Sequence, residues 1–113
     1  MMHFLNYLFF GKQDLINSGL KSFLNITQPD KEKSKKLFRN KYPDTPQETL
    51  DSYFTEYKLL YDFAETNLSN LYKFQVNKRL VKKNFIDAIS ARHKWIDKPN
   101  MEKLYDVCRF NLK

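Results

Sequence analysis

The fold is decided by the stretch from Thr45 to Phe74, TPQETLDSYFTEYKLLYDFAETNLSNLYKF. Apolar residues recur in it every seven positions, and further apolar residues fall between them, which is the pattern of a helix with one broad buried face. A helix over residues 46–74 would be roughly 45 Å long, at about 1.5 Å per residue. The series with seven-residue spacing is Leu50, Tyr57, Ala64 and Leu71.

The motif TPQE at residues 45–48 predicts where this helix begins. The Thr45 side chain can cap it, Pro46 suits the first helical position, and Glu48 can reach back to the Thr45 amide. The continuity of the helix stays open, because two polar pairs farther along have side chains that compete for backbone hydrogen bonds. These pairs are Thr66-Asn67 and Ser69-Asn70.

Helical spacing of apolar residues continues on both sides of this stretch. Thr27 can cap a lysine-rich helix that ends at Tyr42-Pro43, since the residue before a proline is pushed out of helical geometry. Pro99 predicts the end of a later helix by Lys98, and Asn100 can cap the last one. The expected helices cover residues 3–10, 13–25, 28–40, 46–74, 78–97 and 101–111.

Glycine is scarce, with two in 113 residues. Because the tight turns of a sheet protein usually need glycine, this scarcity argues against a sheet fold. Hydrophobic residues make up 42% of the chain and aromatic residues 16%, which is ample material for one core. The sequence therefore predicts an all-α, compact single-domain bundle of five or six helices over residues 1–113, mostly antiparallel. Most aromatic rings are assigned to packing, with Trp95 and Tyr42 as the exceptions that could stack on a ligand.

The apolar segment His3–Phe10 is about eight residues long, which is too short for a membrane span. It also lacks the flanks of a signal peptide, so we expect a helix turned into the core, or, if exposed, a homodimer contact. Cys108 is the single cysteine, which excludes an intramolecular disulfide and fits a cytoplasmic protein with a buried thiol.

The residues offer little for catalysis or cofactor binding. Gly11 and Gly19 are isolated, so neither a Walker loop nor a dinucleotide fingerprint is present. His3, His93 and Cys108 are too scattered for a zinc motif, and His93, beside Arg92 and Lys94, is expected to face solvent or a phosphate. We therefore expect a protein that is not an enzyme and uses no cofactor or metal.

The net charge of +7 is unevenly distributed. Residues 44–65 hold six acids and one lysine, whereas residues 66–96 hold seven lysines or arginines and one acid. The two blocks can neutralise each other inside the fold, or the basic block can face an acidic partner. Lys78, Arg79, Lys82 and Lys83 would form a cationic ridge, and Lys35, Lys36 and Arg39 would extend it if their helices pack side by side.

Such a ridge indicates a small non-enzymatic binding module for an acidic partner, with nucleic acid favoured. The helices on either side of Asn77 could form a helix-turn-helix, although the turn lacks the usual glycine. The alternative is a cytoplasmic protein-binding inhibitor, immunity or adaptor bundle, of the kind carried by mobile elements, that docks a charged face onto another protein.

Overall fold

The structure is a computed structural model that describes residues 14–24, 31–75 and 77–112. All of its regular elements in these ranges are helices, so the all-α prediction is confirmed. The predicted helix over residues 3–10 and the Thr27 cap lie outside the described residues. The described helices are one over residues 14–24, called helix 14–24 below, then α2 (Lys31–Lys41), α3 (Gln47–Phe74), α4 (Lys78–Arg92) and α5 (Lys98–Asn111).

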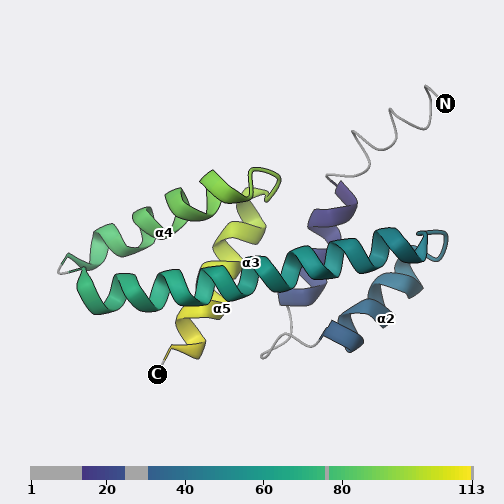
Figure 1. The fold of residues 1–113 in the computed structure, drawn as a ribbon, viewed down its shortest axis with the longest axis horizontal. Coiled ribbons are helices and arrows are strands. Elements are labelled where there is room, and N and C mark those ends of the chain that lie inside the picture. The colour runs from purple at the N-terminus through teal and green to yellow at the C-terminus, as the bar shows by residue number, and fades with distance from the viewer. Residues whose placement is uncertain (1–13, 25–30, 76, 113) are drawn as a thin grey trace.

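The long helix α3 is the axis on which the other helices pack (Figure 1). It is unbroken from Gln47 to Phe74, so the polar pairs near Asn67 do not divide it. The predicted stripe lies inward, with Tyr57, Ala64 and Leu68 fully buried. Burial of this stripe outweighs the weak helix propensity of the polar residues, which are exposed except for the partly buried Asn67.

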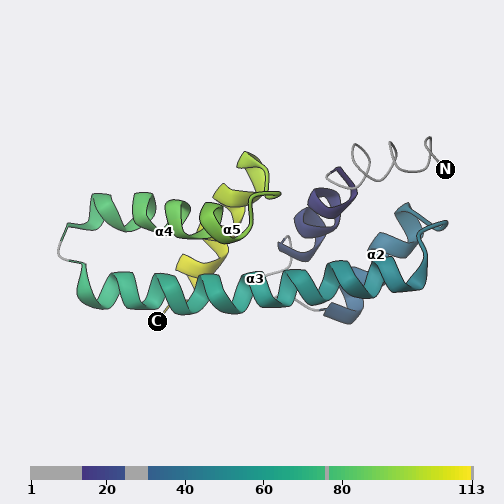
Figure 2. The same ribbon diagram turned by 45° about the horizontal axis from the view of Figure 1, so that its top comes forward.

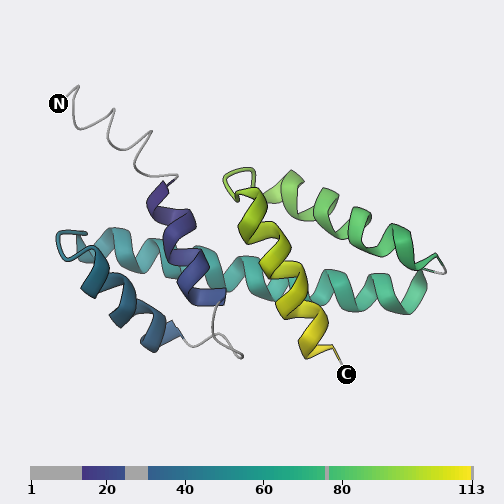
Figure 3. The same cartoon turned by 180° about the vertical axis from the view of Figure 1, so that it is seen from behind.

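The helices are only partly antiparallel. Figure 2 shows α4 folded back along the C-terminal half of α3 as an antiparallel hairpin, whereas α2 packs obliquely against the N-terminal half of α3. Figure 3 shows helix 14–24 and α5 lying across one face of α3 instead. The α3–α4 pair is therefore a helical hairpin and not the crossed pair of a helix-turn-helix.

The predicted cap of α3 is wrong. Pro46 occupies the N-cap position, and no side chain caps the helix. Thr45 lies one residue too early to reach the first free amides, and its own amide donates to the Tyr42 carbonyl at 3.2 Å in the preceding turn. The helix therefore begins at Gln47, one residue later than expected.

The predicted boundary between the last two helices is also corrected. Helix α4 ends at Arg92 and not at residue 97, and α5 begins at Lys98 and not at residue 101. The cap of α5 is Asp97, whose carboxylate accepts the Asn100 amide at 3.0 Å. Pro99 lies in the first turn of α5, where its missing amide costs nothing, so it does not act as the expected helix stop.

A buried asparagine in helix 14–24 explains where these helices end. The Asn17 side chain donates to the Trp95 carbonyl at 2.8 Å and accepts the Asp97 amide at 2.9 Å. The buried Asn100 side chain donates to the Asn17 carbonyl at 2.8 Å and to its side-chain oxygen at 3.1 Å. These bonds satisfy the Trp95 carbonyl and the Asp97 amide of the α4–α5 loop, and they join residues about 80 positions apart in the chain.

Helix 14–24 reaches α3 through a close contact at Gly19. The Tyr57 ring is fully buried, and its hydroxyl donates to the Ile16 carbonyl at 2.6 Å. Burial raises the pKa of Tyr57, so the phenol stays a donor. A Cβ on Gly19 would overlap the Tyr57 hydroxyl and lie 2.9 Å from the Phe38 ring, so a larger residue does not fit without movement.

We predict that Gly19→Ala destabilises the protein despite the better helix propensity of alanine. Overpacking costs about 1–3 kcal/mol, against a gain of about 1 kcal/mol in helix propensity, so unfolding in urea should show a net loss of up to about 2 kcal/mol. The same change made in a Tyr57→Phe background should cost less, because the overlapping hydroxyl is gone. A higher urea midpoint for Gly19→Ala would contradict the close contact.

Candidate basic binding surface

The two predicted groups of cations lie at opposite ends of α3. Helix α2 carries Lys35, Lys36 and Arg39 against the N-terminal half of α3, and α4 lies along the C-terminal half (Figures 1 and 2). Helices α2 and α4 do not touch. The expectation that the α2 cations extend the α4 ridge is therefore wrong.

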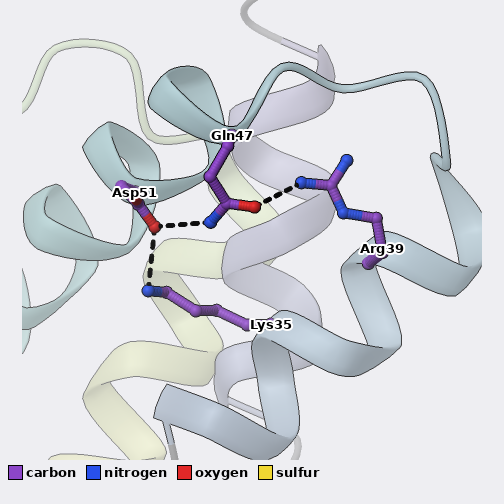
Figure 4. Close-up of polar contacts among 4 residues, drawn as sticks. All are labelled: Lys35, Arg39, Gln47 and Asp51. Atoms are coloured by element: carbon purple, nitrogen blue, oxygen red, sulfur yellow. Dashed lines mark hydrogen bonds and ion pairs between the residues drawn. The ribbon is translucent and has the colours of Figure 1, made fainter.

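Two of the α2 cations join α2 to α3, as Figure 4 shows. Lys35 Nζ lies 3.0 Å from Asp51 Oδ1, and Arg39 Nη2 donates to Gln47 Oε1 at 3.0 Å. Gln47 in turn donates to Asp51 at 3.0 Å, which closes a chain of four side chains across the two helices. Only one carboxylate takes part, so the arrangement retains positive charge.

Arg39 also holds the turn between α2 and α3. Its Nη1 donates to the carbonyl of Pro43 at 3.3 Å and to that of Thr45. Both carbonyls belong to the turn that directs the chain into α3, so the guanidinium has a structural task there. Lys36 is exposed, and it lines a shallow open hollow with Glu32, Lys35, Arg39, Asn40, Gln47 and Leu50.

The four cations in the first half of α4, called the α4 ridge below, form two rows. Lys78 and Lys82 lie at the edge that faces neighbouring helices. Lys78 Nζ donates to the Tyr72 carbonyl at 3.1 Å and lies 4.9 Å from the Tyr72 ring centroid. Lys82 Nζ lies 2.7 Å from Glu102 Oε2 and 5.3 Å from the ring centroid of Tyr105.

The outer row consists of Arg79 and Lys83. Lys83 pairs with Asp87 at 3.0 Å, one helical turn away, and its side chain is 70% exposed. Arg79 is exposed and forms no ion pair with a described residue. Exposed pairs of this kind contribute at most about 1 kcal/mol, so Lys83 can exchange Asp87 for another anion at little cost.

Helices α3 and α4 pack together without neutralising the two charge blocks. Within the described ranges, no lysine or arginine of α4 forms an ion pair with a carboxylate of α3. A carboxylate of α3 is instead contacted by His93, just after α4, whose Nδ1 lies 3.2 Å from Glu56 Oε1. The basic block therefore keeps its charge on the surface.

The expectation that His93 faces solvent or a phosphate is wrong. Its side chain is buried, because the end of α4 at Arg92 turns the imidazole inward toward α3. The ring lies 6.1 Å from that of Trp95 and 6.5 Å from that of Phe63. The contact with Glu56 is within ion-pair distance but lacks the alignment of a hydrogen bond.

The two aromatic residues singled out for stacking are partly buried. Trp95 packs 6.3 Å from the Tyr57 ring, and Tyr42 packs 5.1 Å from the Phe38 ring, with its hydroxyl donating to Ser18 at 3.0 Å. The sequence pattern missed Phe74, the last residue of α3, which is exposed. Phe74 continues the apolar spacing of the α3 stripe, so its spacing does not separate it from the buried residues. Its position at the end of the helix, beside Lys73, is the signal that could have marked it as exposed.

Burial favours the neutral form of two further titratable side chains. Cys108 is fully buried, and burial raises the pKa of its thiol to about 12, which disfavours a thiolate nucleophile. Burial likewise raises the pKa of the Tyr105 phenol to about 12 at the edge of the α4 ridge. Over the part of the chain that the structure describes, His, Cys, Asp and Glu side chains nowhere gather as a metal-binding group, and no helix has the length and apolarity needed to cross a membrane.

Comparisons of this chain with protein-family models, with curated proteins and with solved structures find no match.

We predict that Arg39 and Lys36 respond differently to truncation. Arg39→Ala removes the hydrogen bonds to the turn before α3 and should lower the free energy of unfolding by about 1–3 kcal/mol. Lys36→Ala, a matched loss of one charge on the same helix, should change it by less than about 0.5 kcal/mol. Urea unfolding followed by circular dichroism measures both, and equal effects would refute the structural task of Arg39.

Proposed function

We propose that this protein is a small non-enzymatic module that binds the phosphate backbone of nucleic acids through the α4 ridge. The supporting observation is the positive charge at the turn end of the α3–α4 hairpin. The chain has no carboxylate between Thr66 and Ile86, and this segment includes Lys73 and the four ridge cations. Lys82 and Lys83 have carboxylate partners from outside this segment. Lys73, Lys78 and Arg79 form no ion pair with a described carboxylate, so the turn carries an excess of positive charge, which attracts a polyanion.

The composition of the ridge favours phosphate over an acidic protein face. The centres of protein–protein interfaces are apolar or aromatic and depleted in lysine. The ridge instead presents three lysines and one arginine along one helix, with weak, exposed ion pairs. Exchange of such pairs for phosphates releases counterions, which gives binding without sequence specificity.

The hairpin geometry also supports backbone binding over base reading. An antiparallel pair of helices does not present α4 as the recognition helix of a helix-turn-helix. Lys78 and Lys82 are held at the inner edge of α4 by Tyr72, Glu102 and Tyr105, while Arg79 and Lys83 point outward. Cations in two rows on one helix suit contacts with successive phosphates.

We predict that a quadruple variant, with Lys78, Arg79, Lys82 and Lys83 changed to Ala, keeps its helical circular dichroism but binds nucleic acid at least tenfold more weakly. The slope of log affinity against log salt on duplex DNA should become shallower by about 0.9 for each phosphate that the variant no longer binds. Fluorescence anisotropy with labelled DNA and RNA across a salt series measures both quantities.

The control is a second quadruple variant that removes the same charge from exposed lysines on four other helices. It should retain most of the affinity, because its lysines are spread over the molecule. Equal losses in the two variants would mean that only the net charge matters, and absence of binding by the unaltered protein in low salt would refute the proposal. The control substitutions are Lys21→Ala, Lys36→Ala, Lys58→Ala and Lys98→Ala.

A further inference from the structure

Phe74 is the most exposed of the aromatic side chains that the structure describes. Seven phenylalanine and tyrosine side chains on helix 14–24, α2, α3, α4 and α5 are buried, whereas Phe74 is 75% exposed. Phe74 is the last residue of α3, where the chain turns toward α4, and this turn lies at the end of α3 away from α2 (Figure 1). The buried rings are Phe23, Phe38, Tyr53, Phe54, Tyr57, Phe85 and Tyr105.

The surroundings of Phe74 are cationic. Lys73 Nζ lies 5.7 Å from the Phe74 ring centroid. Arg79, in the first turn of α4, is exposed, and neither Lys73 nor Arg79 forms an ion pair with a described carboxylate. An open aromatic face and uncompensated cations therefore occur together at the turn.

A site with an exposed aromatic ring beside cations binds single-stranded and duplex nucleic acid differently. The bases of a duplex are stacked on one another, so an exposed ring reaches only their edges, whereas an unpaired base offers a free face. Cations that contact phosphates are shared by both forms. We propose that the α3–α4 turn binds single-stranded nucleic acid, with an unpaired base stacked on Phe74 and with neighbouring phosphates held by Lys73 and Arg79.

This inference rests on the proposed function, and it adds a site and a class of ligand. Leu80, in the first turn of α4, is 41% exposed and extends the apolar part of the turn next to the cations. Lys78 is less available than Arg79, because its ammonium group already donates to the Tyr72 carbonyl. Phe74, Lys73 and Arg79 are therefore the residues that we expect to contact the strand.

The test compares Phe74→Leu with the unaltered protein on a labelled single-stranded 20-mer and on the duplex of the same sequence. Loss of the stacking face should weaken single-strand binding at least fivefold and leave duplex binding within about twofold. Phe74→Tyr keeps an aromatic face and should retain single-strand affinity. Phe110→Leu is the matched control, since Phe110 is an exposed phenylalanine on the last helix and not at the turn.

The outcomes separate this inference from the proposed function. An unchanged single-strand affinity in Phe74→Leu, with binding still weakened at least tenfold in the quadruple ridge variant, would overturn the stacking site and leave the proposed function standing. Equal losses on single strand and duplex would also overturn it. Absence of binding to either nucleic acid would overturn both proposals, and binding of polyglutamate in their place would identify an acidic protein as the partner.

Discussion

The close contact between Gly19 and Tyr57 is the constraint on which the rest of the structure depends. Because Gly19 has no side chain, helix 14–24 lies against the middle of α3, and the Tyr57 hydroxyl can donate to its backbone at Ile16. That position places Asn17 where it bonds to the α4–α5 loop. The contact between Gly19 and Tyr57 thus fixes helix 14–24, and the hydrogen bonds of Asn17 fix where α4 ends and α5 begins.

This arrangement gives the two groups of cations different roles. The α2 cations lie beside the N-terminal half of α3, where Arg39 holds the turn and Lys35 pairs with Asp51. At the other end of α3, the α3–α4 turn extends beyond the packed centre, and the carboxylates that pair with the ridge cations there are exposed. The cations at the α2 end of the molecule therefore help to hold the fold together, whereas those at the α3–α4 turn are available to bind an anion.

The sequence predicts what is determined locally. The inward stripe of α3 and the end of α2 before Tyr42-Pro43 follow from apolar spacing and from the geometry of proline, and both are observed. The end of α4 and the inward turn of His93 do not follow, because they depend on Asn17, about 80 residues away. The members of the α4 ridge could be identified from their spacing, but their individual partners and the exposure of Phe74 required the arrangement of the helices.

The most direct test of these roles is a titration of the ¹⁵N-labelled protein with an unlabelled single-stranded oligonucleotide, followed by amide chemical shifts. The central claim is that the turn end of the α3–α4 hairpin binds, while the α2 cations support the fold. It predicts that the largest shift changes fall on residues 73–83 and that the amides of α2 barely move. Changes concentrated on α2 around Lys36, with residues 73–83 unaffected, would contradict it.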